Sequence, residues 1–360
     1  MSLNIDETIR LEPYSLAKKE KEFFFAEHLN AFTQYHYEHC LEYRKILDIL
    51  NYNINVNNSL ESIPFIPVRL FKEYELLSVP QKDIVKTMTS SGTSGQQSSK
   101  IFLDKDNVQN QTRVLSKIII SYIGKSRLPL LLLDTEQVKK NRSLYSARGA
   151  GITGFMTFGR DVLFALDDEM KLRLDQISEL LDQYGDNPIL LYGYTHLIWQ
   201  YIVRELENLG RHLNIKNGIL FHSGGWKKLK EQSVDTSEFN KRVCDTLGNI
   251  RVYNYYGMAE QLGSVFVECE HGRMHSSVFS NVFVRNPKNF ELVTEGESGL
   301  LELQSLLPTS YPGHSLLTED EGTILGEDDC PCGRLGKTFK IHGRVKNAEI
   351  RGCSDTYEKH

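Results

Sequence analysis

The sequence predicts an α/β fold in which parallel strands alternate with helices, followed by a smaller β-rich part. Three observations lead to this prediction. The chain has 360 residues, of which 40% are apolar and 25% charged, as is usual for a large globular domain. Its middle contains short apolar runs, bounded by turn residues and mostly separated by helical patterns, as in βαβ units. After about residue 275 the apolar runs are separated directly by Gly, Pro and Asp, which favours an antiparallel or barrel-like subdomain.

Residues 1–80 form the first predicted segment, a helical wall rich in aromatic side chains. Apolar residues recur at spacings of three and four between Phe24 and Leu50, which indicates amphipathic helices. An aromatic gate for a substrate is an alternative interpretation of the same pattern. The prolines of IPFIPVRLF favour extended backbone near the end of this segment.

Residues 81–275 are predicted to form the α/β core, and 276–342 the β-rich subdomain. In the core, the strands IVKTMT and KIFL flank a Ser- and Gly-rich stretch, and a helix begins near Asp106. The further strands expected in the core are LPLLLLD, VLFAL, NPILLYGY, NGILFHSGG and IRVYNYYG. Those expected in the β-rich subdomain are SVFSNVFVRN, FELVTE, GLLELQSL, GTILG and KTFKIHG. Residues 343–360 are predicted to be a short tail.

Charge, hydropathy and cysteine content exclude several classes of protein. The net charge of −5 disfavours a dedicated nucleic-acid binder. No apolar run approaches membrane-spanning length, and the first residues lack the pattern of a signal peptide. Six scattered cysteines are too few for a disulfide framework. We therefore expect a cytoplasmic protein with reduced thiols, no membrane span and no nucleic-acid partner.

The Ser- and Gly-rich stretch TMTSSGTSGQQSSK, Thr87 to Lys100, has the composition of a loop that binds an anion. Its hydroxyls are hydrogen-bond donors, its glycines allow backbone N–H groups to approach an oxyanion, and Lys100 adds a cation. It is not a Walker A loop, because Ile101 follows Lys100. Composition alone leaves a flexible hairpin turn equally open. The hydroxyls belong to Ser90, Ser91, Thr93 and Ser94, and the glycines are Gly92 and Gly95.

Three charged residues follow predicted strands later in the chain. Glu260, in NYYGMAEQ, is placed to ligate magnesium at a strand end, or to lie at a helix N-terminus where the dipole favours it. Asp320, in LLTEDEG, and Arg344, in KIHGR, are a suitable pair for ribose hydroxyls and phosphate. Either residue alone would be an ordinary surface charge.

In this order the motifs resemble the pattern of the adenylate-forming superfamily, which includes acyl-CoA synthetases. More closely, SSGTSG, SGGWKK, YGMAEQ, CPCGR and IRGCSD resemble acyl-protein synthetases of the LuxE type, whose nearest large relatives are the phenylacetate–CoA ligases. The resemblance extends from about residue 60 to the C-terminus. It implies the large domain of an adenylate-forming enzyme with the C-terminal small domain nearly absent, because only sixteen residues follow Arg344.

The resemblance also implies an ATP site with Mg²⁺. In it Glu260 is the magnesium ligand, Asp320 bonds the ribose hydroxyls and Arg344 lies near the ribose and phosphate. No residue matches the catalytic lysine of the superfamily, so adenylation would depend on Lys100, Lys346 or another group. The other implied ATP-binding residues are Thr89, Ser90, Ser91, Gly92, Thr93, Ser94 and Gly95 in the phosphate loop, Ser223, Gly224 and Gly225 beside adenine, and Tyr256 and Gly257 between adenine and the acyl carboxylate. The run YGYTH, Tyr192 to His196, loosely matches the border of the acyl pocket, and His222 receives no role.

The activity that the resemblance implies is the activation of a fatty or other carboxylic acid as acyl-AMP, followed by transfer to Cys353. A partner reductase or transferase would then accept the acyl group. Cys353 lies near Arg351, whose charge favours the thiolate, although an inert tail thiol is the alternative. Two other functions remain open: a ligase of the phenylacetate–CoA ligase type, and a binding protein without catalysis.

The remaining cysteines suggest a second metal. ECEHGRMH and CPCG supply Cys269, His275, Cys330 and Cys332, with His271 nearby, and these are the ligand types of a closed structural zinc site. The Cys-x-Cys spacing is tighter than usual, so buried or surface thiols beside a rigid turn are the alternative. Cys40 and Cys244 lie in helical patterns and are expected to be ordinary core or surface residues.

Overall fold

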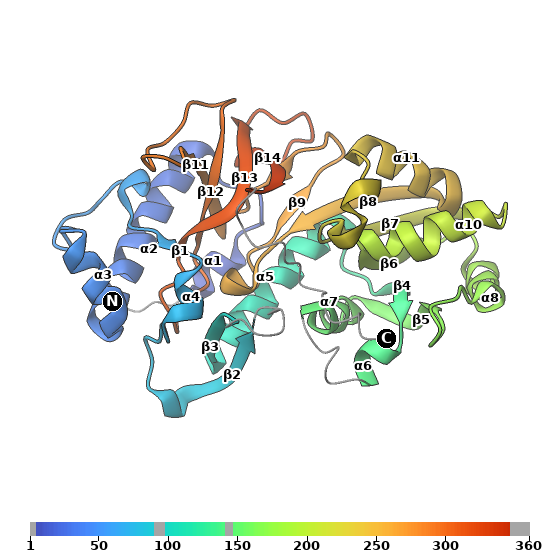
Figure 1. Cartoon of the computed structure of the whole chain (residues 1–360), viewed down its shortest axis with the longest axis horizontal. Coiled ribbons are helices and arrows are strands. Elements are labelled where there is room, and N and C mark those ends of the chain that lie inside the picture. Colours follow the sequence, from blue (N-terminus) through green and yellow to red (C-terminus); the bar gives the residue numbers. More distant parts are fainter. Residues whose placement is uncertain (1–4, 90–97, 141–146, 346–360) are drawn as a thin grey trace. The chain divides into compact units, whose positions relative to one another are not determined.

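The computed structural model describes residues 5–89, 98–140 and 147–345, and divides them into two compact units. The first unit takes its residues from Met1–Tyr122 and Gly257–Glu349, and the second from Ile123–Tyr256. Figure 1 labels the elements of both. The predicted core segment 81–275 is thus divided between the units. The physical reason is that its first hairpin packs against the N-terminal segment.

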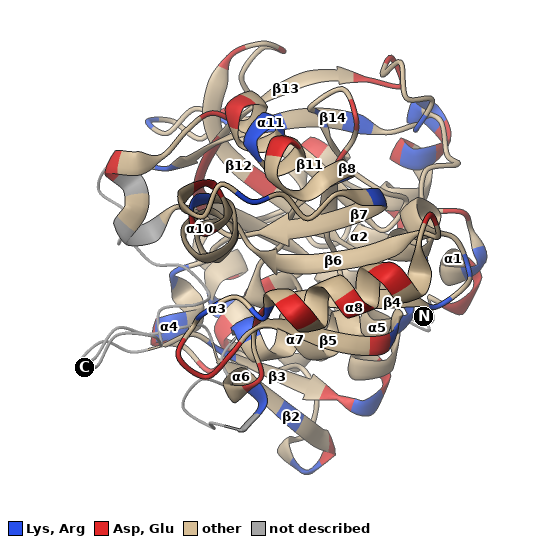
Figure 2. Ribbon diagram, turned by 90° about the vertical axis from the view of Figure 1, so that its right-hand side faces the viewer, with Lys and Arg blue, Asp and Glu red and all other residues tan. Residues whose placement is uncertain are grey.

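The second unit contains the predicted parallel sheet with helices around it. Its strands lie in the order β8-β7-β6-β4-β5, and every described pair in that order is parallel. Figure 2 shows the acidic residues along the exposed face of α8. The strands are β4 (Leu128–Thr135), β5 (Gly159–Leu166), β6 (Ile189–Tyr194), β7 (Ile215–Ser223) and β8 (Gly248–Tyr256). The helices are α6 (Gln137–Lys140), α7 (Ala147–Met156), α8 (Leu174–Tyr184), α9 (Thr195–Leu197), the π-helix Ile198–Val203, α10 (Arg204–Asn208) and α11 (Thr236–Leu247).

The first unit contains an antiparallel sheet in the order β11-β12-β13-β14-β10-β9, with β1 added in parallel to β13. A separate two-stranded hairpin, β2-β3, flanks the Ser- and Gly-rich stretch, as predicted. The strands are β1 (Ile66–Pro67), β2 (Ile84–Thr89), β3 (Lys100–Asp104), β9 (Phe266–Glu268), β10 (Met274–His275), β11 (Ser280–Arg285), β12 (Ser298–Ser305), β13 (Ser315–Glu327) and β14 (Lys337–Arg344).

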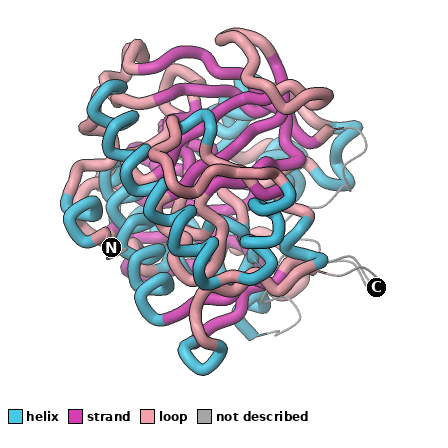
Figure 3. Tube along the Cα trace, turned by 90° about the vertical axis from the view of Figure 1, so that its left-hand side faces the viewer, coloured by secondary structure: helices cyan, strands magenta, loops and turns pink. Residues whose placement is uncertain are grey.

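The helices predicted for the N-terminal segment are present in the first unit. Figure 3 shows this helical face of the chain, with helices in front of strands. The longest helix, α2, ends at His39, and the extended backbone of Cys40 separates it from α3. No helix in the described ranges combines the length and apolar content needed to cross a membrane. The helices are α1 (Asp6–Arg10), α2 (Lys18–His39), α3 (Leu41–Ile49), α4 (Leu70–Glu73) and α5 (Lys105–Ile123).

One predicted strand, FELVTE (290–295), is absent. The segment makes only a single bridge to β11, between Arg285 and Leu292. Phe290 adopts a left-handed backbone conformation, with φ of 59°, which closes a turn instead of extending a strand. The Arg285 guanidinium also donates to the carbonyl of Phe290 at 2.9 Å. The turn is therefore held from within the sheet.

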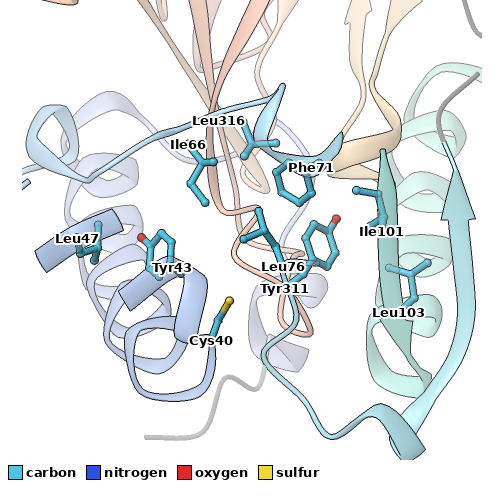
Figure 4. Close-up of a cluster of buried hydrophobic side chains, with 10 residues drawn as sticks. All are labelled: Cys40, Tyr43, Leu47, Ile66, Phe71, Leu76, Ile101, Leu103, Tyr311 and Leu316. Atoms are coloured by element: carbon cyan, nitrogen blue, oxygen red, sulfur yellow. The ribbon is translucent and has the colours of Figure 1, made fainter. Parts of the chain in front are cut away.

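A cluster of buried apolar side chains connects five elements of the first unit (Figure 4). Phe71 of α4 packs edge-on against Tyr311, with ring centroids 5.9 Å apart. Ile66 on β1 pairs with Leu316 on β13, and Ile101 of β3 belongs to the same cluster. The other members are Cys40, Tyr43, Leu47, Leu76 and Leu103. The cluster fixes α4 and the β2-β3 hairpin to the sheet.

Two stacked histidines lie in the interior of the first unit. His36 and His314 are almost fully buried, with ring centroids 5.1 Å apart and planes inclined by 16°. His36 hydrogen-bonds the Ser78 hydroxyl at 2.7 Å and the carbonyl of Pro308 at 3.1 Å. Burial lowers the pKa of His36 to about 3, and burial together with His36 lowers the pKa of His314. Both rings are therefore neutral at neutral pH.

These two histidines predict a loss of stability in weak acid. Below pH 6.5 the unfolded chain binds protons at both imidazoles, whereas the folded chain does not until about pH 3 at His36. The free energy of unfolding should therefore fall as the pH falls from 7 to 5, by about 2 kcal/mol from His36 alone. Urea denaturation at the two pH values measures this change.

His36→Gln should reduce the loss, and His39→Gln, at an exposed position on the same helix, should leave it unchanged. Equal stability of the unsubstituted protein at pH 7 and pH 5 would contradict the prediction.

Candidate functional site

The predicted phosphate loop is carried by the β2-β3 hairpin. Thr89 and Lys100 are directly opposite each other in this hairpin. The Lys100 ammonium lies 3.4 Å from the Glu75 carboxylate, and both side chains are largely exposed. Six of the predicted loop residues lie outside the described residues, so their role stays a prediction: Ser90, Ser91, Gly92, Thr93, Ser94 and Gly95.

Glu260 lies in a buried turn of the first unit, Ala259–Gln261, and is only 7% exposed. The Tyr311 hydroxyl donates to the Glu260 backbone carbonyl at 2.9 Å and holds this turn. Burial raises the pKa of the Glu260 carboxyl, while hydrogen bonding by Ser99 and the charges of Arg344 and Lys72 oppose that rise. Carboxylate oxygens are ligands that Mg²⁺ prefers, so Glu260 is the residue of this turn that could hold the ion.

Asp320 and Arg344 are brought together, as the sequence predicted. They are cross-strand partners on β13 and β14, and Arg344 Nε lies 3.6 Å from Asp320 Oδ1. The Arg344 side chain is 40% exposed, so its guanidinium remains accessible to a ligand. The pairing sets a hydrogen-bond acceptor beside a cation, which is the combination that recognises a ribose phosphate.

Sequence reasoning missed Lys72, a half-buried cation whose charge acts on Glu260. Its position follows from the strand before it. Val68 N–H donates to the Leu317 carbonyl at 2.9 Å, Phe71 packs on Tyr311, and Tyr311 holds the Glu260 turn. The only sequence signal was the basic pair Arg69 and Lys72 around two apolar residues, and it lies almost two hundred positions from Glu260.

The predicted adenine-side residues lie at the carboxyl ends of parallel strands in the second unit. Ser223 ends β7 and Tyr256 ends the neighbouring strand β8. Ser223 is buried, whereas Gly224 and Gly225 are exposed, and Gly224 has a φ of +82°. This edge is where ligands bind in open α/β sheets. Gly257 belongs to the first unit.

Three cysteines and one histidine of the first unit form a compact cluster. Their ligand atoms all lie within 4.8 Å of one another. Cys269 Sγ and Cys330 Sγ are 3.7 Å apart, and Cys332 Sγ lies 3.3 Å from His275 Nε2. His271 is not one of the four, and its backbone N–H donates to the Cys269 sulfur at 3.4 Å. The four residues predicted for zinc therefore converge, from the β9-β10 hairpin and the turn after β13.

The protonation of this cluster fits a thiolate–imidazole metal site. Burial raises the pKa values of Cys269 and Cys330, the latter to about 12, so both are neutral thiols unless a bound metal ion favours the thiolates. Burial acts in the same direction on Cys332, but hydrogen bonds from Arg334 leave its pKa lowered. Burial, followed by the charge of Arg334, lowers the pKa of His275 to about 4, which keeps the ring neutral.

The two cysteines expected to be ordinary residues lie apart from this cluster. Cys40 is buried in the apolar cluster of Figure 4, and Cys244 is half-buried on α11. Cys353 lies outside the described residues.

Comparison with known proteins connects these features to a family. The model of the family described as acyl-protein synthetase, LuxE, matches residues 1–360. The long-chain-fatty-acid–luciferin-component ligase of Vibrio harveyi is 26% identical, over 98% of this chain and 92% of the relative. The ligase of the same name from Aliivibrio fischeri is 26% identical, over 89% and 84%. A phenylacetate-coenzyme A ligase of Thermus thermophilus is 25% identical, over 86% of this chain and 66% of the relative.

A solved structure supports the fold. The open conformation of 2-hydroxyisobutyryl-CoA ligase, in complex with its acyl-adenylate and CoA, superposes with a TM-score of 0.72 at 17% identity. The match covers 96% of this chain and 80% of that one. The predicted fold class, the large domain of an adenylate-forming enzyme, is therefore confirmed.

Proposed function

Because the chain belongs to the acyl-protein synthetase (LuxE) family, we propose that it activates a fatty acid with ATP and passes the acyl group to a protein thiol. The chain is an ATP-dependent ligase of the adenylate-forming kind. Its relatives in Vibrio harveyi and Aliivibrio fischeri are named for long-chain fatty acids, and we extend this substrate class to the present chain.

The observation that carries the proposal is the convergence of Glu260, Asp320 and Arg344 in the first unit. Arg344 forms an ion pair with Asp320, and its charge also acts on the buried Glu260 carboxyl. We assign Asp320 to the ribose hydroxyls and Arg344 to the neighbouring phosphate. Glu260 is the residue that would hold Mg²⁺, which when bound supplies positive charge to the phosphates.

In the activation step an oxygen of the substrate carboxylate forms a bond to the α-phosphorus of ATP. The bond from that phosphorus to the bridging oxygen breaks, and pyrophosphate leaves with the electron pair. Negative charge grows on the phosphate oxygens, so fixed cations lower the barrier. We assign this role to Lys72 and Lys100, both in the first unit, with Lys72 near Glu260 and Lys100 at the base of the phosphate loop.

In the transfer step a thiolate attacks the carbonyl carbon of the acyl-adenylate, and AMP leaves. We propose Cys353 as the acceptor, followed by delivery to an acyl-accepting reductase or transferase. The match of the acyl-protein synthetase family model to the whole chain supports a protein thiol over coenzyme A as the acceptor.

We further propose that Cys269, His275, Cys330 and Cys332 hold a structural Zn²⁺. Three thiolates and one neutral imidazole occupy all four tetrahedral positions, which leaves no open position for catalysis. Zinc bound in this way would join the β9-β10 hairpin to the turn between β13 and β14. Reduced thiols are required, which fits a cytoplasmic location.

Carboxylate-dependent exchange of pyrophosphate into ATP tests the activation step. The unsubstituted protein should catalyse this exchange with long-chain fatty acids. Lys72→Ala should lower the rate on the order of a hundredfold, because a fixed charge near the reacting phosphates is removed. Lys45→Ala, at an exposed position on α3, is the matched control and should retain the full rate. No exchange with any carboxylic acid would overturn the proposal.

Mass spectrometry after incubation with ATP, Mg²⁺ and a fatty acid tests the acceptor. The unsubstituted protein should gain one acyl group that hydroxylamine removes. Cys353→Ser should lose this adduct while keeping pyrophosphate exchange, and Cys244→Ser should keep both. Unchanged labelling of Cys353→Ser by radioactive fatty acid would exclude Cys353 as the acceptor.

Metal analysis tests the zinc proposal. The purified protein should contain about one equivalent of zinc, as expected for one closed site. Cys269→Ser and Cys332→Ser should each lose metal and unfold at lower urea concentration, because unligated thiols remain in a partly buried cluster. Cys244→Ser should match the unsubstituted protein. Zinc well below one equivalent in the unsubstituted protein would dismiss the site.

A further inference from the structure

A hydrogen-bond relay lies at the carboxyl end of the parallel sheet in the second unit. β6 ends at Tyr194, and Thr195 follows it directly, whereas the neighbouring β7 carries His222 and ends at Ser223. Tyr194 pairs with Ser223 in the strand register. Thr195 Oγ1 lies 2.9 Å from His222 Nδ1 and 3.1 Å from the carbonyl oxygen of Ser223.

The direction of this relay follows from the groups present. A threonine hydroxyl has one proton, and a carbonyl oxygen can only accept, so Thr195 donates to Ser223. The hydroxyl oxygen then accepts from the Nδ1–H of His222. The relay thus fixes one neutral tautomer of His222, and burial, which lowers the pKa of His222 to about 3, keeps the ring uncharged.

Packing alone does not explain a histidine at position 222. The residue is 4% exposed, and its Nε2 is buried with no hydrogen-bond partner among the residues that the structure describes. A buried acceptor without a hydrogen bond is unfavourable. The centroid of the His222 ring lies 4.7 Å from that of the apolar Phe239 ring. A leucine would fill this space without the unpaired nitrogen. The histidine is therefore explained by its Nδ1–H, which donates a hydrogen bond to the Thr195 hydroxyl.

The relay acts on the peptide group between Ser223 and Gly224, at the point where β7 ends. Gly224 has a φ of +82°, a backbone conformation that glycine adopts without strain. In a trans peptide the carbonyl of Ser223 and the N–H of Gly224 point in opposite directions. Since Thr195 holds the carbonyl, the N–H of Gly224 is directed away from Thr195, and Gly224 is exposed.

We infer that Thr195 and His222 are positioning residues that lock the Ser223–Gly224 peptide and so present the Gly224 N–H to the adenine base. This inference rests on the proposed function, in which the turn from Ser223 to Gly225 lines the adenine side of the nucleotide. A locked N–H offers a hydrogen bond to a ring nitrogen of adenine, and neither side chain has to touch the ligand.

Steady-state kinetics of pyrophosphate exchange test the inference. Thr195→Val keeps the shape of the side chain and removes the donor, and should raise the KM for ATP about tenfold, as expected for one misdirected hydrogen bond. The kcat and the KM for the carboxylic acid should change by less than about twofold, since the reacting groups are untouched. Thr195→Ser retains the hydroxyl and should restore the KM for ATP.

Two substitutions at His222 separate its nitrogens. His222→Asn places an amide N–H near the position of Nδ1 and should largely preserve the KM for ATP. His222→Gln places its amide near Nε2 and should raise the KM as Thr195→Val does. Thr246→Val is the matched control, because the buried Thr246 hydroxyl bonds carbonyls of its own helix.

An unchanged KM for ATP in Thr195→Val would overturn the inference. A second outcome would also overturn it. In that outcome Thr195→Val has a lower kcat, a higher KM for both substrates and a lower melting temperature, and Thr246→Val shows none of these changes. If the unsubstituted protein catalyses no exchange, the proposed function fails, and calorimetric titration with ATP then decides on the relay. Binding about tenfold weaker in Thr195→Val supports it, whereas equal binding, or no binding by the unsubstituted protein, overturns it.

Discussion

The edge-on packing of Phe71 against Tyr311 is the contact on which the site in the first unit depends. Phe71 brings α4, and with it Lys72, to the sheet. The hydroxyl of Tyr311 holds the carbonyl of Glu260, so one ring positions both the cation and the carboxylate. Gly313 is required beside this ring, because a Cβ there would lie 2.3 Å from Tyr311 Cε2. An apolar cluster thus determines the geometry of charged groups that hydrogen bonds alone would leave mobile.

The pairing of β13 with β14 positions the residues proposed to bind the nucleotide as well as those proposed to bind zinc. Asp320 faces Arg344 at one end of the pair, and the turn at the other end carries Cys330 and Cys332. His275, on β10, pairs with Thr338 of β14. A shift of the pair by one residue would turn alternate side chains to the opposite face, so it would separate Asp320 from Arg344 and disturb the cluster together. Zinc at the turn would therefore also stabilise the register on which the nucleotide pair depends.

The sequence predicted those features that are local or that follow from a fixed strand order. LPLLLLD forms a buried parallel strand because a run of apolar residues bounded by turns has few other stable arrangements. The strand predicted for FELVTE is absent, because tertiary structure determines the left-handed backbone of Phe290 and its contact with Arg285. Lys72 was missed for the same reason, since its relation to Glu260 passes through an aromatic pair. Residues 90–95 and Cys353 lie outside the described residues, so the phosphate loop and the acceptor remain predictions.

Among the described residues, a pair of arginine and carboxylate is buried in each unit, and the two pairs illustrate why polar groups occur in these interiors. Arg285 bonds Glu302 on β12 and donates to the carbonyl of Glu61 at 2.7 Å, which ties the N-terminal segment to the sheet. Arg148 of α7 donates through Nε to Asp134 of β4 at 2.8 Å. A buried pair adds little net stability over apolar residues, but loss of one partner leaves a charge that costs about 3–5 kcal/mol. Such pairs therefore select one arrangement of the chain, just as the relay at Thr195 selects one orientation of a peptide.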